Sequence, residues 1–433
     1  MPSSRARICM LIPGYDPPAG GADRQLDGLL QWIDRDRFAP FVLTSLNHDG
    51  RCADLSGTTP VIRISAPLGP SSFFFSALRY LWKRRKQYDI IHVHSFDLPA
   101  LTGAMIRHLM SDKTLILRIP RCDDGSAYDR LTRTRGGRAR LRFVLAKADA
   151  VIPSCPEATK ALEAAGVSPD KIERIPNGVD AHRFFPANED EKRVLKRSFG
   201  VPEHAFVAIA VARLVPKNDV ACALEAWKRV CVSHPESVLI IVGNGPEGPR
   251  LSAYADTELD GRSVIFTGGT PRDDVARLLR TADVYVSYSR SEEASDAMLE
   301  AMSSGLPVIA ASRPGADQLV RHSKNGFVFD PDHPMDGADY LLRLAEDPAL
   351  LTSMSITARD DVESRHSFEQ IALRVEQLYS DGPRGAGDDP SYSATPPPAV
   401  DPHRSSESAD PQPQSHRRSR RSRRRRRKNR IKL

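Results

Sequence analysis

Short apolar runs alternate with longer amphipathic stretches from residue 1 to about residue 380. The first series of apolar runs is RICMLIP, PFVLTSL, IIHVH, TLILRIP, AVIPS and IERIP, and the second is FVAIAVARL, VLIIVGNG, VIFTGG, VYVSYS and PVIAAS. Amphipathic stretches such as DVACALEAWKRVCVSH and RDDVARLLRTA separate most of these runs. Apolar strands that alternate with helices are typical of βαβ units around a parallel sheet. The pattern therefore predicts an α/β fold.

The two series are separated near NGVDAHRFFPANEDEK, where turn residues and charges precede a new run of strands and helices. The simplest account is two doubly wound domains, residues 1–184 and 185–365. Each domain should place its ligand-binding groups at the carboxyl ends of its strands. The cleft between the two domains is therefore the expected site.

The end of the chain has a different composition. Residues 381–416 are rich in Pro, Ser, Gly and Asp with almost no core-forming residues, which predicts a disordered linker. Residues 417–433 follow with twelve Lys or Arg and no acid. Without this tail the formal charge changes from +7 to −5, because the rest of the chain has 50 basic and 55 acidic side chains. The basic character thus belongs to the tail.

Composition also narrows the class of protein. No apolar run reaches the roughly 18 residues that a membrane-spanning helix needs. The first residues lack the long hydrophobic region and the cleavage site of a signal peptide. Six scattered cysteines favour reduced thiols over a disulfide framework or a zinc site. We expect a cytoplasmic protein.

Two glutamates flank a predicted helix start in RSEEASDAMLEAMSSGLPVIAA, residues 290–311. Gly305 and Pro307 end this helix, which runs back from Ser304 to about Ser295. Glu292 then lies in the preceding loop, and Glu300 lies about one and a half turns inside the helix. Free N–H groups at a helix N-terminus attract phosphate, and a carboxylate on either side of it suits a sugar nucleotide. The alternative is a solvated loop glutamate and a surface helix glutamate.

The same segment resembles the signature of the retaining glycosyltransferases of family four, which is Glu, seven residues, Glu, Ala-Met and Gly-x-Pro-Val. Further stretches resemble the family in order: PAGGADRQLDGLL its amino-terminal glycine loop, IIHVHSFDLPALTG its acceptor-domain strand, IERIPNGVDAHRFFP its interdomain stretch, VARLVPKNDVACALEAW its basic donor loop, IIVGNGPE a later donor-domain loop, and SFEQIALRVEQLY its closing helix. The resemblance covers roughly residues 7–380 and places that closing helix at residues 366–380.

The resemblance implies the GT-B fold, in which two doubly wound Rossmann-like domains face a central cleft. It also implies a metal-independent, retaining transfer of a sugar from a UDP- or GDP-sugar to a glycan or lipid-linked acceptor, in polysaccharide or glycolipid biosynthesis. The donor is a substrate, and no cofactor is expected.

The resemblance further implies roles for single residues. Glu300 would hold the ribose hydroxyls, Glu292 would contact the donor sugar, and Arg213 would neutralise the leaving diphosphate. The implied catalytic residues are Arg213, Lys217 and Glu292, and the implied nucleotide-sugar-binding residues are Gly20, Gly21, Asn218, Gly243, Ala294, Ser295 and Glu300.

Two positions depart from the family pattern. The family has Arg, four residues and then Lys, whereas this chain has Asn218 at the Lys position and Lys217 one residue earlier. A cation lost from a phosphate site costs on the order of a few kcal/mol of transition-state stabilisation. Either Lys217 fills the role or the enzyme is weak or inactive. Glu293 replaces the usual Gly and adds negative charge near the diphosphate.

The acceptor side is less defined. Arg121, Asp123 and Asp124 follow a predicted strand and are candidate acceptor contacts, with a solvated loop as the alternative. His94 is a fourth candidate because it ends the strand IIHVH, where His92 should face the same side; the alternative is packed strand histidines.

Two further motifs are weak evidence, one for a metal site and one for a dinucleotide-binding site. Asp-x-Asp triplets at residues 34–36 and 330–332 match metal-dependent glycosyltransferases but fall in turn-like contexts, and we expect no required metal. GNGPEG matches a dinucleotide-binding pattern, but its prolines make a poor helix opening.

Basic segments suggest partners. The segment Phe73–Lys86 combines aromatic residues with a basic end and, with the arginine-rich residues 130–142, could lie on an anionic membrane. The alternative is an amphipathic helix packed on the sheet. The tail should bind polyanions, and a membrane fits better than nucleic acid, because no aromatic residues interleave its charges. We expect a protein peripheral to the inner face of the membrane.

Two competing hypotheses remain. One is a catalytically degenerate relative that binds a sugar nucleotide or a glycan and acts through its basic tail. The other is a nucleic-acid-binding protein whose binding resides in the tail.

Overall fold

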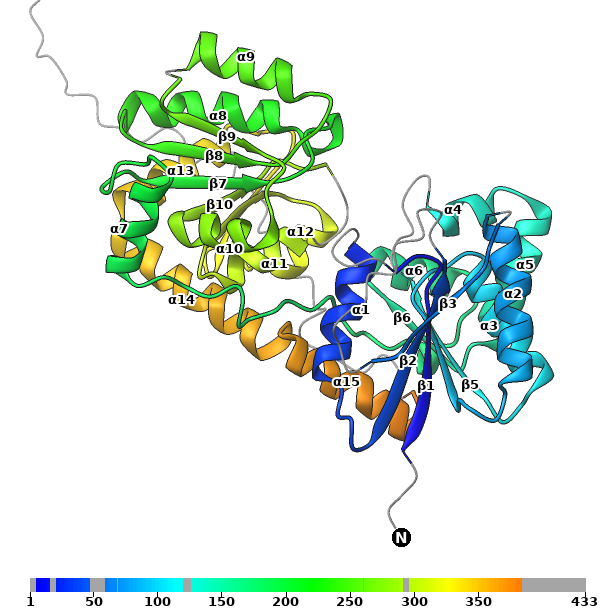
Figure 1. Ribbon diagram of the computed structural model, residues 1–433. Helices are drawn as coiled ribbons and strands as arrows, with labels where there is room; N and C mark the ends of the chain where they lie inside the picture. The colour runs from blue at the N-terminus through cyan, green and yellow to red at the C-terminus, as the bar shows by residue number, and fades with distance from the viewer. Residues whose placement is uncertain are drawn as a thin grey trace, which may run out of the picture. The chain divides into compact units, whose positions relative to one another are not determined.

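The computed structural model describes residues 5–15, 21–46, 59–67, 69–119, 126–259, 261–290 and 296–383. These residues form two six-stranded parallel sheets, each with helices on both faces (Figure 1). The predicted linker and Arg-rich tail lie outside the described residues from residue 384 onward.

The first sheet has the order β3-β2-β1-β4-β5-β6, with every neighbouring pair parallel. Its strands are β1 (Ala6–Leu11), β2 (Phe38–Ser45), β3 (Val61–Ile64), β4 (Ile90–Val93), β5 (Thr114–Ile119) and β6 (Ala150–Pro153). Its helices are α1 (Gly21–Trp32), α2 (Pro70–Lys83), α3 (Leu98–Leu109), α4 (Ala127–Thr132), α5 (Arg135–Lys147) and α6 (Pro156–Ala164). We call this part the N-terminal domain.

The second sheet has the order β12-β11-β10-β7-β8-β9. Its strands are β7 (Val207–Val211), β8 (Val238–Val242), β9 (Val264–Gly268), β10 (Val284–Ser287), β11 (Val308–Ala311) and β12 (Gly326–Phe329). Its helices are α7 (Glu189–Ser198), α8 (Val220–Ser233), α9 (Gly248–Glu258), α10 (Arg272–Thr281), α11 (Asp296–Ser303), α12 (Pro314–Leu319), α13 (Asp336–Glu346) and α14 (Pro348–Arg365). We call this part the C-terminal domain.

Both sheets follow one topology. Counted within its own domain, each sheet has the order third, second, first, fourth, fifth, sixth, which is the Rossmann order. The predicted α/β fold with two doubly wound domains is therefore confirmed.

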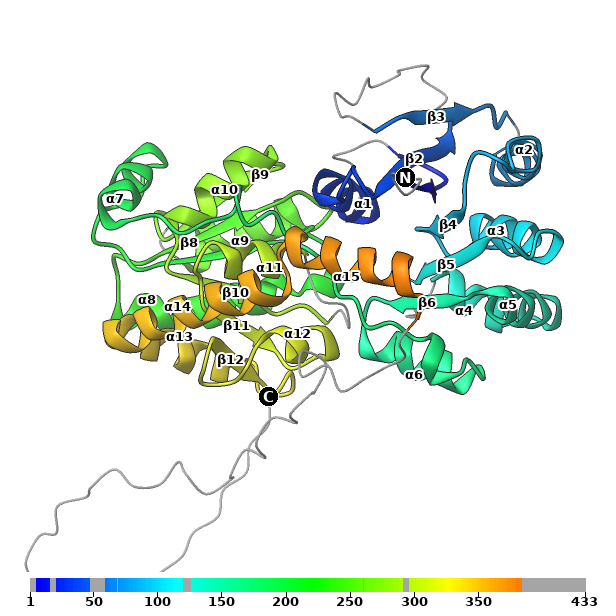
Figure 2. The same ribbon diagram turned by 90° about the horizontal axis from the view of Figure 1, so that it is seen from below.

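Helices sandwich each sheet. In the N-terminal domain α2, α3 and α5 lie side by side on one face, and α1 and α15 (Phe368–Asp381) lie on the other (Figure 2). In the C-terminal domain, side chains of α8, α9 and α13 join one buried cluster, and those of α10, α11 and α12 join the other.

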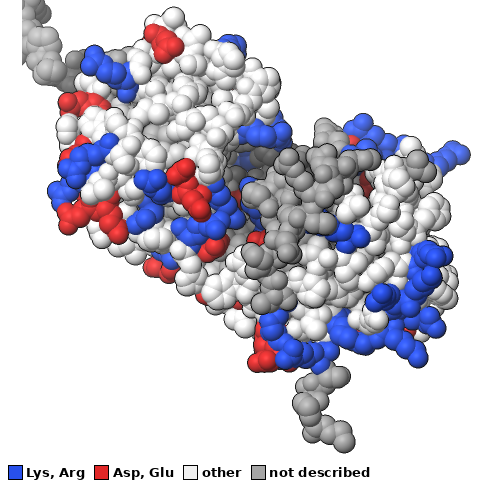
Figure 3. Space-filling model, in the orientation of Figure 1, with Lys and Arg blue, Asp and Glu red and all other residues white. Residues whose placement is uncertain are grey.

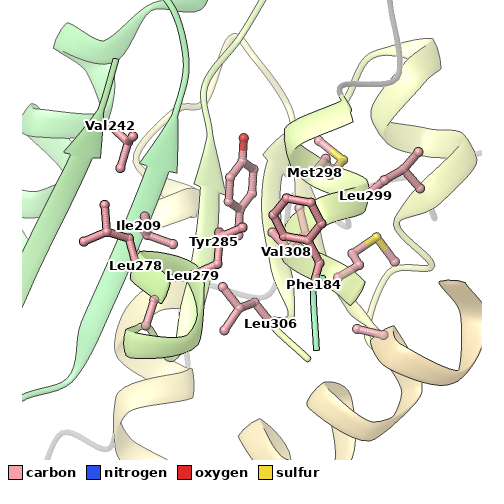
Figure 4. Close-up of a cluster of buried hydrophobic side chains, with 14 of the residues drawn as sticks. Phe184, Ile209, Val242, Leu278, Leu279, Tyr285, Met298, Leu299, Leu306 and Val308 are labelled. Carbon is pink, nitrogen blue, oxygen red and sulfur yellow. The ribbon is translucent and has the colours of Figure 1, made fainter. Parts of the chain in front are cut away.

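The core beneath α11 fixes this helix on its sheet. Met298 and Leu299 point from α11 into a cluster that includes Tyr285 of β10 and Val308 of β11 (Figure 4). Phe184, from the segment between the domains, closes the same cluster and is fully buried. The position of α11 therefore follows from apolar packing.

The chain returns to the N-terminal domain at its end. Helix α14 belongs to the C-terminal domain, and α15 then packs against α1 (Figure 1). The Phe368 ring occupies the space next to two glycines, since an added Cβ would lie 2.1 Å from this ring at Gly28 and 2.5 Å at Gly178. Only glycine at both positions admits the ring.

One predicted strand is wrong. IERIP forms only an isolated bridge between Ile172 and Val151, because a 3-10 turn at Pro169–Lys171 precedes it and the run itself ends in Pro176. Two strands were not predicted: β3, which begins at Val61, and β12, which begins at Gly326; each lies at an edge of its sheet. Among the described residues, no helix is both long and apolar enough to cross a membrane.

Candidate active site

A cavity of about 1070 Å³ lies between the two sheets. On one side it is lined by the loops that follow β7 and β10 and by the first turns of α11. On the other side it is lined by the start of α1 and by residues at the ends of β4, β5 and β6. Because parallel strands present their carboxyl ends to ligands where strand order reverses, this is the expected place for a site.

Glu300 lies in the wall of this cavity and is only 8% exposed. Arg272, the first residue of α10, places Nη2 3.2 Å from Glu300 Oε1. Burial raises the pKa of Glu300, while the positive charges of Arg272 and Arg24 oppose that rise. A buried carboxylate beside a guanidinium can accept hydrogen bonds from ligand hydroxyls.

The basic loop after β7 also lines the cavity, through Arg213, Lys217 and Asn218. Asn218 does not take the place of a cation: its Nδ2 donates to Arg213 O at 2.7 Å, and its Oδ1 accepts from Ser289 Oγ at 3.2 Å. Lys217 is exposed and pairs with no acid among the described residues. Its carbonyl accepts from Arg290 N at 2.8 Å, which holds the backbone of the loop.

Two of the predicted glycines also line the cavity. Gly21 opens α1. Gly243 has φ 137°, and a Cβ there would lie 2.0 Å from Ala212 O. The loop after β8 can therefore pack against the loop after β7 only because this residue has no side chain.

The N-terminal wall includes His94, which is 4% exposed. Its ring centroid lies 4.2 Å from that of His92, so the two histidines face one side as predicted. Burial, aided by the charge of Arg118, lowers the pKa of His94 to about 3. His94 is therefore a neutral imidazole at neutral pH. His92 does not line the cavity, and its Nδ1 lies 2.6 Å from Tyr379 Oη of α15.

Several predicted site residues fall where the structure gives no description. These are Gly20, Glu292, Glu293, Ala294 and Ser295 on the donor side and Arg121, Asp123 and Asp124 on the acceptor side. Among the described residues, the cavity brings together seven predicted site residues: Gly21, His94, Arg213, Lys217, Asn218, Gly243 and Glu300.

Sequence reasoning missed other charged residues of the cavity. Among the described lining residues, six Lys or Arg accompany only two carboxylates: Arg24, Arg118, Arg213, Lys217, Arg272 and Arg313 against Asp296 and Glu300. Arg118 carried a usable signal, because it is the one charge within the apolar run TLILRIP. An excess of cations in a cleft attracts an anionic ligand such as a diphosphate.

The Asp-x-Asp triplets have a local explanation. Asp34 accepts a hydrogen bond from Asp36 N at 2.8 Å, and Asp330 accepts one from Asp332 N at 2.9 Å. Such side-chain turns need no ion. Within the described ranges, no three or more His, Cys, Asp or Glu side chains gather as metal ligands would.

Known protein families match both domains. The family described as Glycosyltransferase Family 4 matches residues 19–183, and the one described as Glycosyl transferases group 1 matches residues 191–361.

Curated relatives match more loosely. A GDP-mannose-dependent monoacylated alpha-(1-6)-phosphatidylinositol monomannoside mannosyltransferase of Corynebacterium glutamicum is 27% identical over 58% of this chain and 66% of its own length. A UDP-Gal:alpha-D-GlcNAc-diphosphoundecaprenol alpha-1,3-galactosyltransferase of Escherichia coli is 30% identical over 50% of this chain and 55% of its own length. The chain thus spans between about half and two thirds of these two relatives.

Solved structures show the same fold. Anabaena Alr3699/HepE, crystallised in complex with UDP, superposes with a TM-score of 0.71 at 22% identity, covering 87% of this chain and 100% of that one. Sucrose-phosphate synthase from Thermosynechococcus elongatus gives a TM-score of 0.71 at 20% identity, covering 87% and 99%. The architecture is that of GT-B proteins, and the chain belongs to glycosyltransferase family 4.

Proposed function

We propose that this protein transfers a sugar from a UDP- or GDP-sugar to a glycan or lipid-linked acceptor, in polysaccharide or glycolipid biosynthesis. The observation that carries the proposal is the buried Glu300 in a cavity that also holds Arg213 and Lys217. The relatives support it, since the two named above are a GDP-mannose-dependent mannosyltransferase and a UDP-galactose-dependent galactosyltransferase.

The cavity offers a fitting group to each part of the donor. The carboxylate of Glu300 would accept hydrogen bonds from the ribose hydroxyls. The first N–H groups of α11 would bind the diphosphate, together with Arg213 and Lys217. Glu292 would contact the donor sugar, and Ala294 and Ser295 would also bind the nucleotide sugar. Gly21 would let the N-terminal domain approach the diphosphate.

The proposed reaction retains configuration at the transferred sugar and needs neither a metal nor a resident cofactor. The bond between C1 of the sugar and the diphosphate oxygen breaks, and the acceptor oxygen bonds to C1 on the same face. The acceptor hydroxyl gives its proton to the departing phosphate oxygen. Negative charge grows on the leaving diphosphate, so Arg213 and Lys217 would act by stabilising it.

Lys217 is the better candidate for the cation that the family usually places one residue later. The Asn218 side chain is bonded within its loop, whereas the Lys217 side chain is exposed to the cavity. With this cation in place, no observation on the described residues favours a binding-only role over turnover.

The experiment is calorimetry of UDP and GDP with the full chain, followed by transfer assays with the preferred donor series. Glu300→Gln should lower nucleotide affinity about 10²-fold, because a buried hydrogen-bonded carboxylate is lost. The matched control is Glu376→Gln, since Glu376 is also a buried glutamate (4% exposed) but lies on α15 outside the cavity. Equal nucleotide affinity of Glu300→Gln and the parent would contradict the proposal.

We further propose that α2 places the protein on an anionic membrane. Phe73 faces the core and cannot contact lipid, which corrects the expectation for that residue. The opposite side of the helix exposes Phe75 (67%), Arg79 and Trp82 (46%), followed by Lys86. Aromatic side chains beside cations suit the boundary between head groups and acyl chains.

The surroundings of α2 extend this basic surface. Helices α2, α3 and α5 contain no Asp or Glu. Exposed cations follow α2 at Arg84 and Arg85 and recur on α5 at Arg138 and Arg142. Figure 3 shows Lys and Arg gathered at the outer edge of the N-terminal domain, with few acids near them. The charge complements anionic lipid, and the protein would be cytoplasmic and peripheral.

The membrane proposal is tested by sedimentation with vesicles of phosphatidylglycerol and phosphatidylcholine. High salt suppresses binding that depends on charge alone, including that of the Arg-rich tail. Under those conditions Phe75→Ser with Trp82→Ser should lower the bound fraction about tenfold. Val232→Ser, at an 81% exposed residue of the C-terminal domain, is the matched control. Unchanged binding of the double variant would contradict the proposal.

A further inference from the structure

The first residue of α11, Asp296, receives three side chains from outside the C-terminal domain. Its Oδ1 accepts from Gln25 Nε2 at 3.1 Å and from Asn177 Nδ2 at 3.2 Å. Its Oδ2 lies 3.4 Å from Nη2 of Arg24. Gln25 and Arg24 belong to α1, so this carboxylate joins α1 to the start of α11.

The two amides are held in place by other bonds. Gln25 Nε2 also donates to Gly178 O at 2.9 Å, and its Oε1 accepts from Gly178 N at 2.7 Å. Asn177 Oδ1 accepts from Arg118 Nη2 at 2.8 Å. Asp296 therefore keeps the hydrogen bonds from Gln25 and Asn177 even when Arg24 moves away.

Arg24 is bound more loosely. Its contact with Asp296 is the longest of the three, and its side chain is 34% exposed. Its Nε is buried and has no hydrogen-bond partner among the described residues. A guanidinium has five N–H donors, so most of the hydrogen-bonding capacity of Arg24 is available to a ligand.

Arg24 faces the cavity that the cations of the loop after β7 also line. It lines the cavity with Arg213 and Lys217 but comes from the opposite wall. Its charge also acts on Glu300, the proposed ribose ligand, which lies one turn beyond Asp296. The start of α11, where the diphosphate is proposed to bind, is thus within reach of Arg24.

We propose that Arg24 is a further catalytic residue, which turns from Asp296 to the diphosphate of the donor and adds, from the N-terminal domain, a third cation to Arg213 and Lys217. Asp296 is its positioning residue, because it holds the guanidinium beside the helix N-terminus. A guanidinium that binds a diphosphate gains charge-assisted hydrogen bonds with two parallel N–H donors. The inference rests on the proposed function, because it assumes a nucleoside diphosphate in this cavity.

The test compares ligands that differ only in phosphate. Affinities of uridine, UMP and UDP (or of guanosine, GMP and GDP, if that base is preferred) are measured on the full chain by calorimetry and ligand-observed NMR. Arg24→Gln should lower UDP affinity about tenfold or more and uridine affinity less than twofold, and should lower kcat about 10-fold to 10²-fold. Arg24→Lys should recover part of both losses.

The matched control is Arg37→Gln. Arg37 also pairs with a buried carboxylate, Glu376, at 3.5 Å, but it lies outside the cavity. An equal loss for uridine and UDP, or no loss for UDP, would overturn the role of Arg24 while leaving Glu300-dependent binding intact. A parent protein that binds no nucleoside diphosphate, or binds it equally with Glu300→Gln, would overturn the proposed function itself and this inference with it.

Discussion

The two domains share one strand order and differ in what stands at the carboxyl ends of their strands. The C-terminal domain presents a buried carboxylate, Glu300, and the cations Arg213 and Lys217 on a loop. The N-terminal domain presents a neutral histidine, His94, and a buried arginine, Arg118. The same scaffold thus carries different side chains at its strand ends, and the proposed function assigns one set to the donor and the other to the acceptor.

Burial disfavours the charged form of both Glu300 and His94, but neighbouring arginines change the outcome at each residue. Burial favours the uncharged form of a side chain, so it raises the pKa of Glu300 and lowers that of His94. Arg272 opposes this effect at Glu300, whereas the charge of Arg118 adds to it at His94. Arg272 thus favours a charged Glu300, and Arg118 favours a neutral His94 on the opposite wall.

The strongest test of this contrast removes Lys217, a cation of the loop after β7. Lys217→Ala should lower kcat about 10²-fold, because roughly 2.7 kcal/mol of stabilisation of the leaving diphosphate is lost. Steady-state transfer assays measure it, with Lys228→Ala as the control, since Lys228 is an exposed lysine of α8 paired with Glu258. Full activity of Lys217→Ala, together with a gain of activity in Asn218→Lys, would show that Lys217 does not stabilise the leaving diphosphate.

A smaller effect, on nucleotide affinity, is expected when Arg272, the ion-pair partner of Glu300, is replaced. The groups that face this carboxyl are Arg272 of α10, Arg24 of α1 and Asp296 of α11. Nucleotide binding should need ionised Glu300, so affinity should fall as the pH falls through the pKa of Glu300, which is raised. Without the charge of Arg272 this pKa rises further, and the loss should begin at a higher pH.

Arg272→Gln should therefore weaken UDP binding about tenfold at pH 6 and less at pH 8, by calorimetry across that range. Arg277→Gln is the control, because Arg277 lies on the same helix and pairs with Asp274 on the surface. A loss that is the same at every pH would mean that Arg272 acts on the ligand rather than through Glu300.

The smallest effect is expected at His94, on the N-terminal wall of the cavity. His94 has a pKa of about 3 in the folded protein and an ordinary value of 6.5 in the unfolded chain. Below pH 6.5 the unfolded state binds a proton that the folded state does not, so the free energy of unfolding falls as the pH falls. His94→Gln should reduce this fall by about 1.4 kcal/mol per pH unit at most.

Urea denaturation at pH 7.5 and pH 5 measures the change. His204→Gln, at an exposed histidine paired with Glu236, should leave the fall with pH as it is. The same fall in His94→Gln and in the parent would mean that His94 does not stay neutral on acidification.

The sequence predicts the sheets well because their strands are apolar on both faces. Ten of the strands coincide with predicted apolar runs, whereas VIRI contains a charge and GFVF begins with a glycine, so neither stands out as an apolar run. The donor half of the cavity follows from local order in the sequence, since Glu300 and the loop of Arg213 carry family motifs. Arg24 and Arg272 could not be predicted, because neither motif nor periodicity shows which surface their helices present to a distant part of the chain.

The packing of α15 has a consequence for synthesis. Ile371, Ala372, Val375, Leu378 and Tyr379 share one buried cluster with residues of β1 and α1. The ribosome makes β1 and α1 more than three hundred residues before it makes α15. During synthesis the part of the first sheet that α15 covers therefore stays exposed until the second sheet has been made. The N-terminal domain is the last to be completed.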